Sequence, residues 1–124
     1  MLREIGAYLA TKGIGTVGTD IFLGLMPDQP DNCIALFEYA GSPPDLHWNG
    51  EYPGLQVRVR NKSYAAGRAK IGEVVNELHG LHEQVLSGTR YLLIKAKGSP
   101  EVLKRDGSNR TEWFVNFEII KESD

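Results

Sequence analysis

Two histidines are spaced closely enough to act together. His79 and His82 lie three residues apart near the end of an expected helix, where one helix face could present both imidazoles to a metal ion. No cysteine or second histidine pair with matching spacing accompanies them. Solvated histidines at a helix end, where their charge suits the helix dipole, are therefore the favoured interpretation.

The paired acids are a second candidate for chemistry. Asp28 and Asp31 lie three residues apart, each directly after a proline, but no apolar surroundings are expected that would separate the pKa values of an acid and a base. We interpret them as polar loop residues. The lowest-ranked of three functional hypotheses, a small metal-dependent hydrolase or nuclease, would use Asp28, Asp31, Glu38 and His47.

The single cysteine and the glycine-rich segment offer little more. Cys33 lies in an apolar run, which favours a buried thiol over a nucleophile, and it cannot form an internal disulfide, as fits a reducing cytoplasm. The segment Gly13–Gly18 has the spacing Gly-x-Gly-x-x-Gly. It follows a helix and precedes a strand, the reverse of the order in dinucleotide-binding sites. We expect no catalytic residue, no metal and no cofactor.

A basic row is one of two features that a hydrophobic core does not explain. Arg58 and Arg60 alternate with apolar residues on a strand, and Lys62 continues the row. The row is either an exposed sheet face balanced by Glu112 and Glu118 on a neighbouring strand, or a surface for a partner or nucleic acid. The sequence leaves these two interpretations even.

The second feature is a long expected loop, Gly41–Gly54, that carries large apolar side chains. A loop of this length that carries Leu46, Trp48 and Tyr52 is uncommon in a small domain unless it docks somewhere. The loop either folds back as a lid over the core or contacts a partner. We favour the partner, because the prolines lower the entropy lost on binding.

A hairpin arm over Gly98–Arg110 is expected to make a second contact of the same kind. The pair Asp106-Gly107 within it is a strong turn signal. Leu103 and Arg105 are the candidate contact residues of this arm.

The elements that position these residues fit one domain over residues 1–124. The chain is 41% hydrophobic and 24% charged, with a formal net charge of −2, which disfavours a partner bound mainly through phosphates. No apolar run reaches the ~20 residues of a membrane span, and no secretory signal is expected. Periodicity predicts helices over 2–11 and from a Ser63 cap to Leu81, and strands over 21–26, 33–39, 55–60, 84–86, 90–97 and 111–120.

These elements predict an α+β fold. A mostly antiparallel mixed sheet carries the N-terminal helix and the long helix on it, with the hairpin arm protruding. Gly67 and Gly72 inside the long helix each cost ~1 kcal/mol against alanine, so tertiary packing must sustain the helix or something must approach it closely.

Several segments taken in order carry a family resemblance. They are Pro53–Arg60, Ser63–Ala69, Tyr91–Lys97, Gly98–Pro100, Arg105–Gly107 and Glu112–Phe117. Together they resemble the minor capsid proteins of tailed bacteriophages and prophages, a group similar to tail-terminator, or tail-to-head joining, proteins. The resemblance spans nearly the whole chain, and its weight lies in the order of the segments.

The resemblance implies a structural virion protein, present in the host bacterial cytoplasm during assembly. Such a subunit forms a hexameric ring at the head-proximal end of the tail, ends tail-tube polymerisation and joins the tail to the head. The implied partners are further copies of the chain, the tail-tube protein and the head-completion (connector) protein. DNA would pass through the lumen without specific binding, and no membrane is involved.

The alternative hypothesis is a small nucleic-acid-binding module. Its sheet face would carry Arg58, Arg60 and either Tyr91 or Phe114. Binding of this kind weakens steeply as salt rises.

Overall fold

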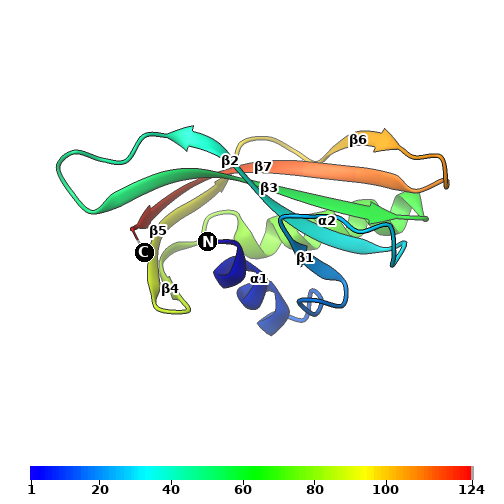
Figure 1. Cartoon of the computed structure of the whole chain (residues 1–124), viewed down its shortest axis with the longest axis horizontal. Coiled ribbons are helices and arrows are strands. Elements are labelled where there is room, and N and C mark those ends of the chain that lie inside the picture. The colour runs from blue at the N-terminus through cyan, green and yellow to red at the C-terminus, as the bar shows by residue number, and fades with distance from the viewer. Residues whose placement is uncertain (124) are drawn as a thin grey trace.

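The computed structural model describes residues 1–123 and contains two helices and seven strands (Figure 1). In chain order the elements are α1 (Leu2–Thr11), β1 (Ile21–Leu23), β2 (Cys33–Ser42), β3 (Gly50–Asn61), α2 (Tyr64–Leu78), β4 (His82–Leu86), β5 (Thr89–Ala96), β6 (Glu101–Arg105) and β7 (Thr111–Glu122).

All the strands belong to one mixed sheet in the order β1-β2-β3-β7-β5-β4, and β6 also pairs with β7. Only the β1–β2 pair is parallel among residues 1–123. The strands β5 and β6 share one edge of β7, with β6 beside its beginning and β5 beside its end. The predicted α+β class, with a mostly antiparallel mixed sheet, is confirmed.

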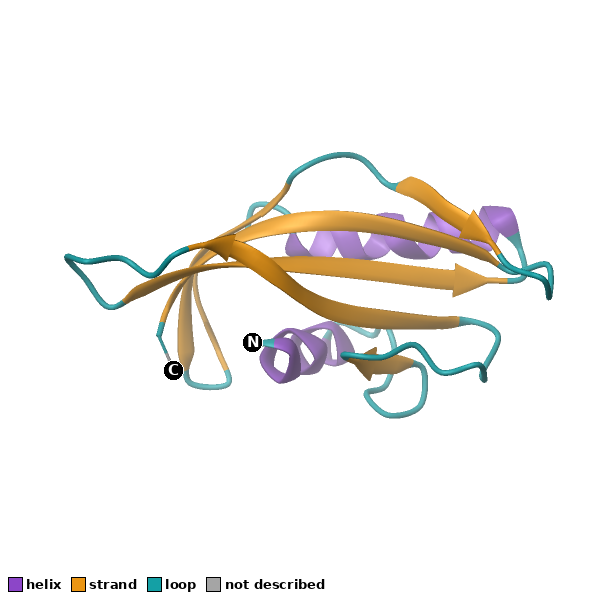
Figure 2. Cartoon of the chain, turned by 45° about the horizontal axis from the view of Figure 1, so that its top comes forward, coloured by secondary structure: helices purple, strands orange, loops and turns teal. Residues whose placement is uncertain are grey.

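The core lies between one face of the sheet and both helices. Leu55, Val57 and Val59 of β3 are at most 1% exposed, as their alternation predicted. Figure 2 shows the sheet with its helices, which cover one face only. The other buried members from β7 and the helices are Trp113, Val115, Phe117, Ile119, Ile5, Leu9, Ile71, Val74 and Leu78.

The first helix has the predicted bounds, and the second ends earlier than predicted. Ser63 caps α2 by accepting a hydrogen bond from the Ala66 N–H at 3.1 Å. The helix stops at Leu78 instead of Leu81, because Gly80 adopts a φ of 87° and donates its N–H to the Ile94 carbonyl. The close approach expected at Gly67 is to Trp113: a Cβ there would lie 3.1 Å from the indole.

Half of the expected loop Gly41–Gly54 is strand, which corrects the sequence prediction. The strand β2 continues to Ser42 and β3 begins at Gly50, leaving a loop of residues 43–49. Tyr39 and Trp48 lay their rings where a Cβ of Gly54 and of Gly50 would stand. The two glycines therefore make room for aromatic rings and do not break the strand. Pro53 lies opposite a bulge in β2, where the missing N–H of a proline is tolerated.

The predicted hairpin between Gly98 and Arg110 is present and extends the sheet. Its first half is β6, which pairs with β7 from Glu101↔Phe114 to Arg105↔Thr111. The arm is therefore an edge strand over part of its length, because its backbone bonds to β7.

Other boundaries shift only slightly. The strand β1 ends at Leu23 instead of Met26, since Gly24 takes a φ of 79° and ends the pairing. Between β4 and β5, Ser87 and Gly88 both have positive φ, as a tight two-residue hairpin turn requires. In the part of the chain that the structure describes, neither helix is long and apolar enough to cross a membrane.

Candidate functional site

The loop 43–49, called here the hairpin tip, is held by a small polar network. Tyr52 Oη donates to Asp45 Oδ2 at 2.7 Å, and Trp48 Nε1 donates to Tyr52 Oη at 3.0 Å. The second carboxylate oxygen of Asp45 accepts the His47 N–H at 2.8 Å. With the Asp45 carboxylate and the Trp48 indole N–H paired in this way, the tip projects Leu46 into solvent at 93% exposure.

The network also sets the ionisation of its members. The Tyr52 hydroxyl, with the His47 backbone N–H, holds the pKa of Asp45 below its ordinary value. The same carboxylate raises the pKa of Tyr52, so the phenol remains a donor at neutral pH. Leu46, Trp48 and Tyr52 therefore lie together at one end of the molecule, as the sequence grouped them.

The basic row is divided by the fold. Arg58 lies on the sheet face opposite the helices, 4.6 Å from the centre of the Phe37 ring, and donates from Nε to Gln56 Oε1 at 2.6 Å. Lys62, mostly exposed, pairs with Asp31 at 3.3 Å. We call the uncovered sheet surface around Arg58 the open face.

Arg60 lies on the same side of β3 but is buried, at 4% exposure. Its guanidinium donates to the backbone carbonyls of Pro27, Asp28, Pro30 and Asp31 at 2.6 to 3.2 Å. All these acceptors lie in the segment between β1 and β2, so Arg60 holds that segment on the sheet and is not part of the exposed basic surface. Opposite it on β7 is Glu112, the expected neighbour, which pairs instead with Lys104.

Arg110 makes a second buried cluster that sequence reasoning missed. Its side chain is 6% exposed and forms ion pairs with Asp28, Asp31 and Asp106 at 2.7 to 3.2 Å. These carboxylates raise its pKa further above the ordinary value, led by the hydrogen bond to Asp28. Burial opposes ionisation of Asp106, but hydrogen bonds from Arg110 outweigh it and lower the pKa of this acid. The available signal was an arginine four residues after an Asp-Gly turn.

The edge strand β6 carries the remaining predicted contact residues. Leu103 is 39% exposed and Arg105 is exposed, as is every residue of this strand. They lie at the opposite end of the long strands from the hairpin tip (Figure 1). The structure therefore places the predicted contact residues of the loop and of the arm on two separate surfaces.

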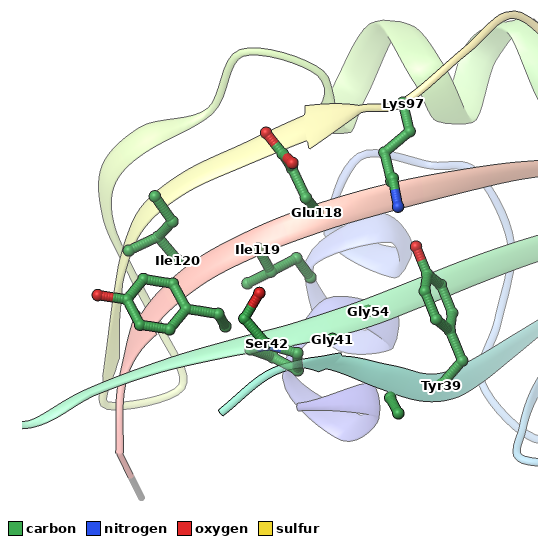
Figure 3. A pocket seen from close by; sticks show the side chains of 11 residues that line it. Tyr39, Gly41, Ser42, Gly54, Lys97, Glu118, Ile119 and Ile120 are labelled. Carbon is green, nitrogen blue, oxygen red and sulfur yellow. The ribbon is translucent and has the colours of Figure 1, made fainter. Parts of the chain in front are cut away.

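A pocket of about 390 Å³ lies beside the β2 bulge (Figure 3). Tyr39, Gly41 and Ser42 of β2 line one side, and Glu118 of β7 lies across it. Tyr39 Oη donates to the Phe117 carbonyl at 3.3 Å, and Lys97 Nζ lies 5.7 Å from the Tyr39 ring. This is a polar hollow in a sheet face, suited to holding a side chain of a partner.

Several of the candidate catalytic groups have structural roles. Asp28 and Asp31 bind Arg110, and His79 Nδ1 accepts the Ala96 N–H at 2.9 Å. Burial raises the pKa of the Cys33 thiol, which opposes its use as a nucleophile. Within residues 1–123 no three side chains of His, Cys, Asp or Glu are grouped to hold a metal ion.

The surface of the nucleic-acid hypothesis is not assembled. Tyr91 is fully buried on the helix side, where its hydroxyl donates to Glu4 at 2.6 Å. Arg60 is also buried, which leaves Arg58 and the half-buried Phe114 on the open face. Two residues of four make a weak platform for stacking bases or binding phosphates.

Comparison with known proteins gives the chain a family. A family model described as "Bacteriophage tail terminator protein" matches residues 8–123. No curated protein matches the chain. Among solved structures, a chain from the "Virion of native gene transfer agent (GTA) particle" has the same fold, with a TM-score of 0.66 and 18% identity over 86% of this chain and 81% of that one.

Proposed function

The chain belongs to the bacteriophage tail terminator family, and from this premise we propose that its copies close into a ring at the head-proximal end of a phage tail. The family is structural and non-enzymatic, which agrees with the structural roles of the titratable side chains described above. The ring ends polymerisation of the tail tube on one side and receives the head-completion (connector) protein on the other. Each subunit has five further copies and these two proteins as its partners, and DNA crosses the lumen of the ring without specific contacts.

One observation supports a ring in particular: the sheet has two unlike open edges. On one side, β1 covers β2 only at Ile34–Leu36, which leaves the rest of β2 without a neighbour within residues 1–123. On the other side, β6 and β4 end the sheet. A head-to-tail ring needs two different surfaces on each subunit, unlike a two-fold dimer, which uses one surface twice.

Function as a terminator also needs a surface for the tube. The hairpin tip suits this role, because Leu46 is exposed and its loop is already ordered by Asp45, Trp48 and Tyr52. An ordered tip loses less conformational entropy when a partner covers it. The open face, where Arg58 lies against the Phe37 ring and donates to Gln56, is the candidate surface toward the lumen.

The first experiment measures particle mass over a range of protein concentrations by light scattering, with negative-stain imaging of the same samples. Six subunits of 13.8 kDa give about 83 kDa, and a particle of that mass with a central hole is expected. The second adds the protein to polymerising tail-tube protein, where shorter tubes with a cap at one end are expected. Tubes of unchanged length and without caps would contradict the proposed function.

A further inference from the structure

We infer that neighbouring subunits join by main-chain pairing, with the open edge of β2 in one copy against the β6 edge of the next. This inference rests on the proposed ring and names the contact that closes it. Added strands of this kind gain affinity from backbone hydrogen bonds, and the side chains along them set the register.

The backbone of Glu38 is directed to the open edge. The Ile34 N–H donates to the Asp20 carbonyl and the Leu36 carbonyl accepts from the Gly24 N–H, so these two residues face the β1 side. Successive residues of an antiparallel strand alternate between its two edges, and the β2–β3 register is unbroken from Cys33 to Tyr39. Glu38 therefore presents its N–H and carbonyl outward, beyond the end of β1.

The strand β6 offers a suitable partner edge. All five of its residues are exposed, and Val102 and Leu103 expose apolar side chains at 40% and 39%. An exposed edge with apolar side chains is a template for pairing unless something covers it. β4, the other edge on this side of the sheet, runs parallel to β2, whereas β6 runs antiparallel to it. Antiparallel pairing is the more stable arrangement.

Charge supports this choice of partner. In the strand register, Glu38 lies opposite Leu55 and Arg105 lies opposite Thr111. Both side chains are therefore on the side of the sheet that carries the helices. In a continuous sheet the two side chains would share that side. Within residues 1–123 neither Glu38 nor Arg105 forms an ion pair, so both remain available for an acid–base contact between subunits.

The pairing also provides the offset that a closed sheet requires. When the register is followed from β6 across β7 and β3 to β2, β6 lies level with the beginning of β2. Glu38 lies farther along, just past the middle of β2. Placing Arg105 of one copy opposite Glu38 of another shifts the copies by about six residues along the strands, or roughly 20 Å. A sheet that closes on itself needs such a stagger, accompanied by tilted strands.

A charge exchange is the first test. Glu38→Arg and Arg105→Glu should each lower the amount of 83 kDa particle at least about tenfold at a fixed concentration, because like charges then face each other at every contact of the ring. The double variant should recover most of the ring. Recovery would not follow from misfolding, so unchanged rings in both single variants, or failure of the double variant to recover while its monomer melts normally, would overturn the inference.

Two further variants separate the main chain from the charge. Glu38→Pro removes the charge and the outward N–H, whereas the matched control Glu38→Thr removes only the charge. Proline is tolerated where an N–H faces solvent, so both monomers should fold. The ring should be lost with proline and only weakened with threonine; equal effects would overturn main-chain pairing.

Cross-linking gives a positive signal for the contact. With Glu38→Cys and Arg105→Cys in one chain, oxidation should give a ladder of linked subunits, since residues opposite each other in paired strands lie within disulfide range. The control pair Glu38→Cys and Val85→Cys places the second thiol on β4 and should give none. A ladder from the control alone would assign the contact to β4. A wild-type protein that remains at 13.8 kDa at every concentration would overturn the proposed ring together with this inference, whereas rings without the β2–β6 cross-link would overturn the inference alone.

Discussion

The two ends of the long strands treat polar and apolar groups in opposite ways. At one end, here called the clamped end, Arg60 and Arg110 bind the segment between β1 and β2, and their charges are used inside the subunit. At the other end, the hairpin tip satisfies its polar atoms locally and exposes Leu46. Buried charge that loses its partner is costly, whereas an exposed leucine costs the folded monomer little. Arg60 and Arg110 of the clamped end therefore serve folding, whereas the hairpin tip is free to serve assembly.

The largest expected effect is that of Arg110→Ala. It leaves Asp28 and Asp106 without a cation, and leaves Asp31 with Lys62 alone. The Arg110 and Asp106 side chains are mostly buried, whereas Asp28 is exposed to solvent, so the loss is moderated by water and we expect the Tm of the monomer to fall by about 5 to 10 °C in thermal unfolding.

Arg105→Ala is the matched control at the same end, because this arginine is exposed and forms no ion pair within residues 1–123. Its Tm should remain near that of the wild type. If both variants melted alike, the clamped end would not be the stabilising half of the comparison.

Acid should loosen the clamped end next. Burial alone would raise the pKa values of Asp31 and Asp106. Hydrogen bonds from Lys62 to Asp31 and from Arg110 to Asp106 outweigh this effect, so both pKa values are lowered in the folded protein. A lowered folded pKa contributes stability above the ordinary value of 3.8, and this stability is lost as pH falls through the folded pKa. The Tm should therefore drop as pH falls below about 4.

Asp106→Asn tests the source of this acid sensitivity. The amide cannot titrate, so the variant should start with a lower Tm at pH 7 and lose less of it between pH 5 and pH 2 than the wild type does. Thermal unfolding followed by circular dichroism across that range measures both curves. Parallel curves would remove Asp106 from the explanation.

The contrast between the two ends also marks what sequence could predict. Alternation in β3 and helical periodicity in α2 depend on spacings of only a few residues. The burial of Leu55, Val57 and Val59, and of Ile71 and Val74, agrees with these two patterns. Local periodicity also placed Arg60 beside Arg58 on one face. It could not show that a segment about 30 residues earlier covers Arg60, because that contact depends on the tertiary path of the chain.

At the hairpin end the error was of another kind. Glycine and proline predicted a long loop, but Gly50 and Gly54 make room for Trp48 and Tyr39, which pack across the hairpin. A residue that usually breaks a strand can be required inside one when an aromatic ring needs its space. The grouping of Leu46, Trp48 and Tyr52 survived this error, since sequence proximity alone keeps them together.

At the hairpin end, Trp48→Ala should have a moderate effect. The indole is 36% exposed, packs on Gly50 and donates to Tyr52, so its loss should cost about 1 kcal/mol in the free energy of unfolding. The isolated subunit should remain folded, while binding to the tail tube weakens because the tip is no longer ordered. Chemical denaturation and a tube-capping assay measure the two effects. A loss of several kcal/mol would make Trp48 a core residue.

The smallest effect on folding is expected from Leu46→Ser. A side chain that is 93% exposed loses almost no buried area on truncation, so the free energy of unfolding should change by less than about 0.5 kcal/mol. If the tip binds the tube, capping should nevertheless fall at least as far as in Trp48→Ala, since an apolar anchor at the centre of an interface often carries much of the affinity. Exposed Leu25, at 55%, provides the control as Leu25→Ser. Equal capping by both serine variants and the wild type would mean that the exposed leucine at the tip has no partner in the tail, and the division of labour between the two ends would fail.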